Sequence, residues 1–382
     1  MPESVPAGPP IDPALFQGLS PQNPHLCCGS EAPLLKTMAD ALQTYAEARS
    51  QGSKGRRRLE AAKDDAKRRL AAFLGEPGGT ETIAFTPGTA PALDVVARAI
   101  DWKAGDEIVL PAREYPSVTL AWRALPERGV TVRRIDGGTD PESALLDAVT
   151  ARTRLVCVSH VDWRTGRRLD LERLGAGLRP RGILLAADVA HSVGVLPVPV
   201  RACDILVGCT HKFLLGMHGV GFLFWRDPPA AAQGRTTLGW YALQSLDRFV
   251  AGGDAALKPG AAAFEPSNPA FIAILGLARG LDCLEAAGPG RIAAHAAALA
   301  AETHAALSRR GIPCLTPAEP ERRGTSLAIP DPWGETLFRH LDAAGIRCAH
   351  GVGRLRLSFH GYNTLRDLER LTDVLANAPI GA

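Results

Sequence analysis

One stretch of the sequence combines an apolar run with a polar ending: Ile205-Leu206-Val207-Gly208-Cys209-Thr210-His211-Lys212. The run is short and rich in β-branched residues, which is typical of a buried strand. Lys212 follows that strand and precedes the apolar residues Phe213–Gly216, so its amine is poorly placed for solvent. Partial desolvation lowers the pKa of a lysine and suits it to imine formation. Lys212 is therefore a candidate nucleophile at a strand end.

A second apolar run, Ile183–Asp188, ends in an acidic residue and continues as Asp188-Val189-Ala190-His191. A carboxylate at the end of a buried strand is costly unless it is paired. A protonated pyridinium nitrogen is a partner that would explain it, and an N-cap role for Asp188 is the alternative. Ligands of open α/β sheets bind at the carboxyl ends of the strands, where both polar clusters are expected.

A third polar cluster, Thr86-Pro87-Gly88-Thr89, follows the predicted strand Thr82–Phe85 and opens a predicted helix near Ala90–Ile100. Such a turn offers backbone N–H groups, hydroxyls and the positive end of a helix to a phosphate. Turns of this composition also join strands to helices for structural reasons alone. The cluster indicates a phosphate site only in combination with Asp188 and Lys212.

Strand-like runs alternate with helical segments through the middle of the chain. Further strands are predicted at Glu107–Leu110, Val130–Arg134, Leu155–Ser159 and Gly221–Trp225, and helices near Ser117–Leu125, Glu142–Val149 and Leu171–Leu178. This alternation predicts βαβ units and a largely parallel sheet. Two amphipathic helices, Leu34–Ser50 and Arg57–Leu74, are expected before the first strand.

The last third of the chain has a different pattern. Long Ala/Leu helical patterns at Ala270–Ala287 and Arg291–Arg309 precede strands at Thr325–Ile329 and Gly353–Ser358 and helices at Gly334–Ala344 and Thr364–Leu375. We expect an N-terminal arm over residues 1–20, a large domain over 21–270 and a small α+β domain with its linking helix over 271–382. The first helices are candidates to pack on the small domain.

Composition argues against several classes of partner. The 382 residues carry a net charge of +3, from 43 basic and 40 acidic residues, which gives no footprint for nucleic acid. The sequence contains no apolar stretch of about 18 residues that would span a membrane. Eight scattered cysteines lack the paired spacing of zinc or redox sites, so no metal is expected. The Pro-rich start, Met1–Pro13, lacks a signal-peptide layout, and a cytoplasmic location is expected.

The residues around Lys212 resemble the core signature of class V aminotransferase-like enzymes, which use pyridoxal 5′-phosphate (PLP). The resemblance rests on Asp188–Gly194, Asp204–Gly216 and Gly219–Leu223, and extends from about His25 to Leu375. The group includes cysteine desulfurases, isopenicillin-N-epimerase-like proteins and kynureninases. It implies PLP fold type I: an α/β large domain with a mainly parallel, seven-stranded sheet flanked by helices, and a smaller α+β C-terminal domain.

The resemblance also implies roles for matching residues. Lys212 matches the lysine that holds PLP as a Schiff base, Asp188 the partner of the pyridinium nitrogen, and His191 the residue near the phenolic oxygen of the ring. Tyr115, in Glu114–Ser117, matches the aromatic residue that stacks on the ring, and a tyrosine covering the core edge is the alternative. The other implied cofactor-binding residues are Gly88, Thr89 and His211 at the phosphate, His160 and Thr165 within Ser159–Gly166, and Trp240, Ser267 and Asn268, from segments that a neighbouring subunit contributes.

For the substrate, Arg356 matches the arginine that binds its carboxylate, and a guanidinium fork suits bidentate recognition of that group. A surface arginine is the alternative for this position. Specificity for the side chain of the amino-acid substrate is expected from four loop or strand-end residues, His25, Ser30, Trp163 and His360. The resemblance further implies a homodimer, because such sites lie at a subunit interface.

Two departures from the desulfurases bear on the reaction. Cys348 runs almost at once into the Arg356 strand, and Tyr115 stands where desulfurases have a stacking histidine. We therefore expect a lyase that acts through an aldimine and a Cα carbanion, by β-elimination or by Cβ–Cγ or C–S cleavage. An epimerase or aminotransferase, a desulfurase using Cys348 and a catalytically degenerate scaffold remain alternatives. A nicotinamide oxidoreductase is disfavoured because Thr86–Ala90 lacks the G-x-G-x-x-G pattern.

Overall fold

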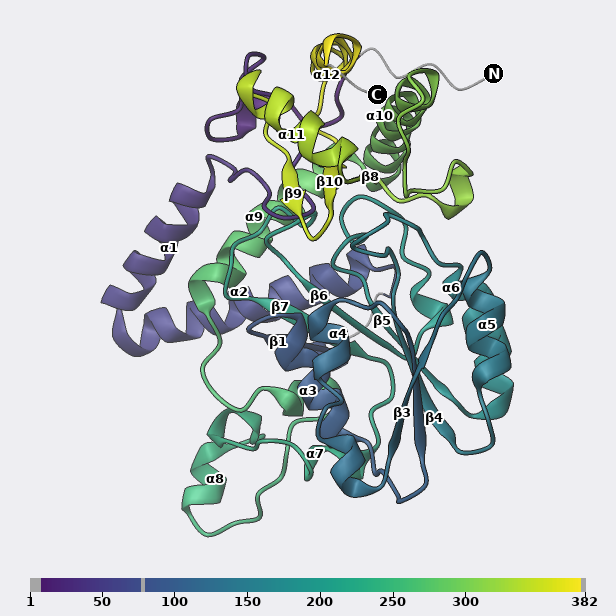
Figure 1. Cartoon of the computed structure of the whole chain (residues 1–382). Coiled ribbons are helices and arrows are strands. Elements are labelled where there is room, and N and C mark those ends of the chain that lie inside the picture. The colour runs from purple at the N-terminus through teal and green to yellow at the C-terminus, as the bar shows by residue number, and fades with distance from the viewer. Residues whose placement is uncertain (1–7, 77–79, 379–382) are drawn as a thin grey trace.

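A seven-stranded sheet forms the centre of the larger part of the molecule (Figure 1). The computed structural model describes residues 8–76 and 80–378; the first seven residues of the predicted N-terminal arm lie outside this description. The strand order is β1-β7-β6-β5-β4-β2-β3, and β7 alone runs antiparallel to its neighbours. The strands are β1 (Ile83–Thr86), β2 (Glu107–Pro111), β3 (Thr131–Ile135), β4 (Thr153–Ser159), β5 (Leu184–Asp188), β6 (Ile205–Cys209) and β7 (Gly221–Trp225). The predicted mainly parallel sheet is confirmed.

Both faces of this sheet are covered, which explains why its strands are continuously apolar. Along β4, Val156 and Val158 belong to one hydrophobic cluster, whereas Leu155 and Cys157 belong to another. Successive side chains of a strand point to opposite faces, so each face has its own core. The helices of this part are α3 (Thr89–Ala99), α4 (Pro116–Leu120), α5 (Pro141–Ala148), α6 (Leu171–Leu178), α7 (Ala230–Gln233) and α8 (Leu246–Val250).

The C-terminal part is built on a second sheet of three antiparallel strands in the order β8-β10-β9. Its strands are β8 (Ser326–Pro330), β9 (Ala349–Gly351) and β10 (Arg354–Ser358), and its helices are α10 (Pro289–Arg309), α11 (Trp333–Ala343) and α12 (Leu365–Asn377). These elements gather at one end of the molecule (Figure 1). Helices α1 (Met38–Ser50), α2 (Gly52–Phe73) and α9 (Phe271–Ala287) pack on one another. In the described part of the chain, no helix has both the length and the apolar character needed to cross a membrane.

Two predicted helices are shorter than expected. The helix predicted from Leu34 begins at Met38, because the backbone around Leu35 is already bonded to Phe16 and its neighbours as an isolated bridge. The helix predicted to reach Leu125 ends at Leu120, and Leu125 opens a 3₁₀ turn that contains Pro126. The residue before a proline is disfavoured in α-helix, which explains why the helix does not extend through Leu125.

The chain before α1 lies on the small sheet. The Leu26 N–H donates to Arg347, and the Ser358 N–H at the end of β10 donates to Leu26. Residues 24–28 fall within the predicted large domain, yet they extend the small sheet beside β10. The domain boundaries drawn from sequence remain predictions.

Helix α9 supports the turn that follows β6. Gly280 lies against the carbonyl of Leu214 and the backbone of Leu215, and the backbone N–H of Leu215 donates to Lys212. A Cβ at Gly280 would collide with the Leu214 oxygen. Only glycine permits this close approach of the helix to the turn.

We predict that Gly280→Ala lowers the free energy of unfolding by about 1–3 kcal/mol, because α9 must move away from Leu214. Urea unfolding of the variant measures the loss. The matched control is Gly290→Ala in the first turn of α10, where a Cβ would meet nothing within 4 Å. Equal stability losses in the two variants would show that the contact with Leu214 is unimportant.

Candidate active site

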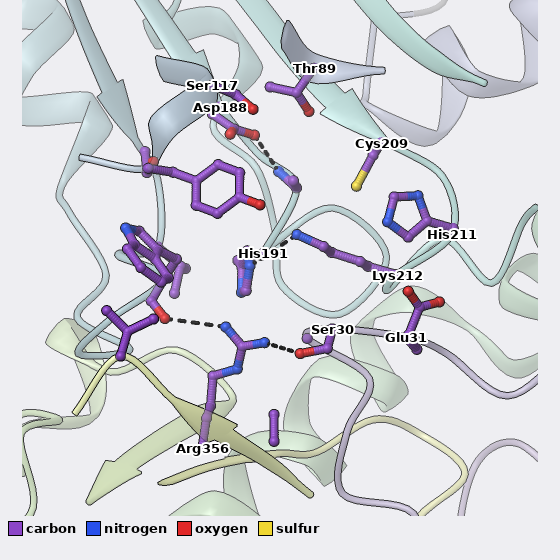
Figure 2. Close-up of a pocket in the computed structure, with 18 of the residues that line it drawn as sticks. Ser30, Glu31, Thr89, Ser117, Asp188, His191, Cys209, His211, Lys212 and Arg356 are labelled. Atoms are coloured by element: carbon purple, nitrogen blue, oxygen red, sulfur yellow. Dashed lines mark hydrogen bonds between the residues drawn. The ribbon is translucent and has the colours of Figure 1, made fainter. Parts of the chain in front are cut away.

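A pocket of about 450 Å³ opens between the two sheets, at the carboxyl ends of β4, β5 and β6. These three strand ends contribute Ser159, Asp188, and the group Cys209, His211 and Lys212. The pocket is also lined by Gly29–Glu31 from the N-terminal segment and by β10 with the turn before it, as Figure 2 shows in part. The site therefore lies where the strand-end rule places ligands of α/β sheets.

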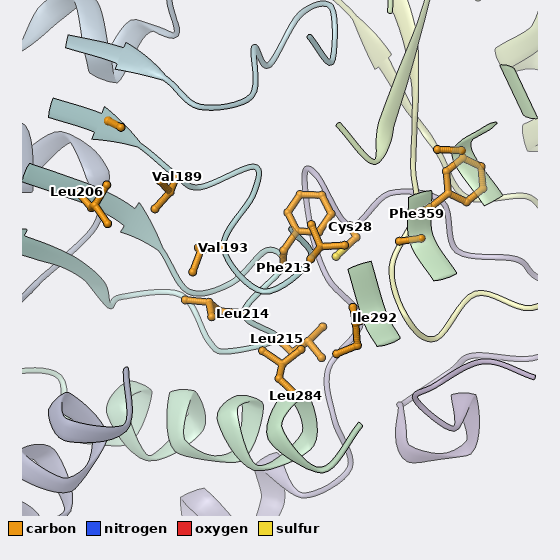
Figure 3. Close-up of a cluster of buried hydrophobic side chains, with 14 of the residues drawn as sticks. Cys28, Val189, Val193, Leu206, Phe213, Leu214, Leu215, Leu284, Ile292 and Phe359 are labelled. Atoms are coloured by element: carbon orange, nitrogen blue, oxygen red, sulfur yellow. The ribbon is translucent and has the colours of Figure 1, made fainter. Parts of the chain in front are cut away.

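Lys212 points into this pocket, and its Nζ lies 3.2 Å from His191 Nε2 (Figure 2). Burial, reinforced by the charge of Lys212, lowers the pKa of His191 well below its usual value. His191 is thus a neutral imidazole that can accept a hydrogen bond from the amine. Behind Lys212, the side chains of Phe213, Leu214 and Leu215 pack in the apolar core (Figure 3), which fixes the backbone that carries the lysine.

Asp188 is a buried carboxyl group, 7% exposed, that forms no salt bridge among the described residues, although the charge of Lys212 acts on it. Its Oδ1 accepts the N–H of Ala190 at 2.9 Å. Burial raises the pKa of Asp188 to about 6. A protonated ring nitrogen is a partner that would stabilise the ionised carboxylate in this position.

The end of the pocket near α3 is suited to an anion. Gly88 is the N-cap of this helix and provides no side-chain cap, and Gly88 and Thr89 both line the pocket. His211 also lines it, with its ring stacked on that of His218 at 4.2 Å between centroids. Burial lowers the pKa of His211 to about 4, so it serves as a neutral donor. The donor set fits PLP, with Lys212 for the aldehyde, Asp188 for the ring nitrogen and the start of α3 for the phosphate.

Arg356 approaches the pocket from the small sheet. Its Nη1 donates to the carbonyl of Trp163 at 3.2 Å and its Nη2 donates to the hydroxyl of Ser30 (Figure 2). Its Nε is buried without a partner in the described structure, and the side chain is 7% exposed. A buried guanidinium with neutral partners is suited to bind a carboxylate.

Tyr115 and Trp163 form an aromatic wall. Their ring centroids are 5.3 Å apart at 75°, and Lys212 Nζ lies 5.6 Å from the centroid of Tyr115. Glu114, whose role was not predicted, fixes this wall: its carboxyl accepts the N–H and hydroxyl of Ser159, both at 2.6 Å, and the N–H of Tyr115 at 3.0 Å. Burial raises the pKa of Glu114 to about 7. The sequence signal was an acidic residue beside Tyr115, but its partner on β4 depends on tertiary structure.

Four predicted residues near the site do not line the pocket. His160 follows Ser159, so strand alternation turns its ring to the opposite side, into a separate cavity with Arg168. Thr165 accepts the Arg167 N–H within its own turn. His360 is buried and bonds the carbonyl of Phe213, and His25 bonds the hydroxyl of Tyr362. In this single chain the last two support the packing between the small sheet and the core.

The residues expected from a neighbouring subunit also lie outside this pocket. Trp240 is 45% exposed, Ser267 is exposed, and the side-chain oxygen of Asn268 accepts a hydrogen bond from Arg56. Their exposure leaves them available to a second chain.

The thiols near the site are protonated at neutral pH. Cys348 is absent from the pocket lining, and burial raises the pKa of its thiol to about 12. Cys209 does line the pocket, and burial raises its thiol pKa to about 11. A nucleophilic cysteine needs its thiolate form, so neither thiol is activated in this arrangement.

The chain is similar to known proteins in sequence and in fold. The family model described as Aminotransferase class-V matches residues 31–371. The chain is 28% identical over 377 residues to a probable cysteine desulfurase of Methanothermobacter thermautotrophicus, covering 90% of each chain. It is 31% identical over 346 residues to isopenicillin N epimerase of Amycolatopsis lactamdurans, covering 81% of this chain and 83% of that protein.

A solved structure of a C-DES variant with glycine covalently linked to its PLP cofactor has the same fold. Its TM-score is 0.85 at 22% identity, and the match covers 96% of this chain and 99% of that one. The cofactor of these enzymes is PLP, which agrees with the donor set around Lys212. The chain belongs to the class-V aminotransferase family of PLP-dependent enzymes.

Proposed function

We propose that this enzyme is a lyase that removes a substituent from the side chain of an amino acid. The observation that carries the proposal is the position of Lys212 and Arg356, an amine and a guanidinium that enter one pocket from different sheets (Figure 2). When bound, PLP supplies an electron sink for the electron pair left at Cα. The protein must hold the substrate, remove one proton and keep the ring nitrogen charged.

Each of these tasks has a residue. Arg356, steadied by Ser30 and the Trp163 carbonyl, binds the α-carboxylate and so orients Cα. Lys212 Nζ takes the Cα proton, and the neutral ring of His191 holds the amine in place while a bound substrate leaves it free. Asp188 carries the negative charge that keeps the ring nitrogen protonated. Tyr115 covers the cofactor side of the pocket.

The state of the thiols favours a lyase over a desulfurase that uses Cys348. A desulfurase of that kind needs a thiolate to receive sulfur, whereas Cys348 is buried outside the pocket lining with a raised thiol pKa. Elimination of a side-chain substituent requires no cysteine. Of the described residues that line the pocket, Lys212 is the only amine. A single amine on a flexible side chain is suited to remove the Cα proton before the leaving group is lost.

A homodimer is part of this proposal. Five large apolar side chains are exposed along the segment between β7 and α9: Leu238, Trp240, Leu246, Phe249 and Val250. Exposed apolar surface is typical of contacts between proteins. A second copy placed here would cover Trp240 and could bring Ser267 and Asn268 toward the partner's site.

We predict that Lys212→Ala abolishes covalent attachment of the cofactor. Borohydride reduction of the PLP-loaded wild type should add the mass of the cofactor to the chain, and the variant should gain none. Exchange of the Cα proton of candidate amino acids should fall by about 10²–10⁴-fold, since the base is lost. Lys54→Ala, on the exposed start of α2, is the control and should behave as wild type. Cofactor trapped on the Lys212→Ala chain would refute the assignment.

For Asp188→Asn we predict attachment of the cofactor with at least about 10²-fold slower Cα proton exchange, because an amide cannot stabilise the charged ring nitrogen. Without cofactor, the pKa of Asp188 is about 6, above its unfolded value of about 3.9. The native state then binds more protons, and this group's contribution to stability falls as pH rises through that interval.

The cofactor-free variant should therefore gain stability relative to wild type between about pH 4 and pH 6. Urea unfolding at pH 4.5 and 7.5 measures this difference. A variant that is less stable than wild type at pH 7.5 would mean that the ionised carboxyl already has a favourable partner.

The dimer is tested with Trp240→Asp, which places a charge on this exposed apolar segment. Sedimentation velocity should show a dimer for wild type and a shift toward monomer for the variant, because a buried unpaired charge is costly. Leu365→Asp, at an exposed position on α12, should leave the dimer intact. A monomeric wild type, or a dimer unaffected by Trp240→Asp, would argue against this interface.

A further inference from the structure

Strand β10 presents two arginines to the pocket. Leu355 and Leu357 face the apolar core, so Arg354 and Arg356 lie on the opposite face of the strand, and both line the pocket. Both are buried, with Arg354 6% exposed and Arg356 7% exposed. Among the described residues, the hydrogen-bond acceptors of these two guanidinium groups are all neutral. They are the carbonyl oxygens of residues 163, 164 and 351 and the hydroxyl of Ser30.

Two buried positive charges without an anion are costly. Burial, together with repulsion by the charges of Arg356 and Arg164, lowers the pKa of Arg354 to about 10. The α-carboxylate of an amino acid can neutralise Arg356. Arg354 then stays buried beside it without a salt bridge among the described residues, and the charge of Asp162 offsets its own only in part.

Arg354 is held in a fixed position. Its Nε donates to the Arg164 carbonyl at 2.7 Å, its Nη2 to the Trp163 carbonyl at 2.6 Å and its Nη1 to the Gly351 carbonyl at 3.0 Å. The guanidinium carbon also lies 4.8 Å from the centroid of the Trp163 ring. A guanidinium has five N–H groups, so one remains on each Nη for a ligand. The fork is preorganised, and little side-chain entropy is lost when it binds.

We infer that the substrate carries a second carboxylate on its side chain and that Arg354 binds this group. The inference rests on the proposed function, in which Arg356 binds the α-carboxylate. Two residues along a strand span about 7 Å, which exceeds the separation of the carboxylates in aspartate. The substrate class is therefore an amino acid whose second carboxylate lies several bonds beyond Cβ.

A matched pair of probes tests the inference. S-(carboxymethyl)cysteine carries the second carboxylate, and S-(carbamoylmethyl)cysteine replaces it with a neutral amide of similar shape. The dissociation constant of each is measured with PLP-loaded protein by titration calorimetry. Wild type should bind the carboxylate probe at least about tenfold more tightly, since a charge-assisted hydrogen bond contributes about 1.5–3 kcal/mol.

Arg354→Gln should bring the two dissociation constants to within about twofold by weakening the carboxylate probe alone. Arg356→Gln should weaken both probes and keep their ratio, because both have an α-carboxylate. Arg339→Gln, exposed on α11, should change neither. The ratio within one preparation does not depend on how much of a variant is folded, so a loss of the Arg354 tethers does not obscure the result.

Equal binding of the two probes by wild type would overturn the inference, and so would an unchanged ratio in Arg354→Gln. Pyruvate release is followed separately. Elimination would take the Cα proton and break the Cβ–S bond, releasing the thiol and 2-aminoacrylate, which water converts to pyruvate and ammonia. A preference for the carboxylate probe without pyruvate would support the role of Arg354 while contradicting the lyase proposal.

Discussion

The structure depends on how rigidly the turn after β6 is held, because this turn fixes the position of Lys212. Phe213, Leu214 and Leu215 are buried behind the lysine, the ring of His360 bonds the carbonyl of Phe213, and α9 approaches the turn through Gly280. A flexible amine would spend most of its time in solvent. Packing from two sheets and one helix instead keeps it at the boundary between core and pocket, where the other site residues converge on it.

The pocket around this point concentrates buried ionisable groups that form no salt bridge within the described part of the chain. Asp188 lies on one side, and Arg354 and Arg356 lie on the other. Buried groups of this kind reduce the stability of the free protein. A ligand that supplies the opposite charges restores this stability when it binds. These charges therefore indicate which ligand groups the pocket binds: a cationic ring nitrogen at Asp188 and anionic groups along β10.

Much of the fold and the centre of the site could be predicted from sequence. Asp188 and Lys212 each end a short apolar run, and parallel strands bring such ends together, so their meeting follows from the strand pattern. His160 shows the limit, because its side of the strand is set by alternation and by what packs there. His360 and His25 serve the core through contacts with distant residues. Glu114 acquires its role only where β2 pairs with β4, a contact invisible in local sequence.

The pairing of residues 24–28 with β10 has a mechanical consequence. Ser30 lies two residues beyond this segment, and its hydroxyl accepts one of the hydrogen bonds that steady Arg356. Residues 24–30 and the small sheet are thereby joined into one body that carries the carboxylate-binding end of the site, while the large sheet carries the cofactor end. An amino acid bound across the pocket would link this body to the central sheet.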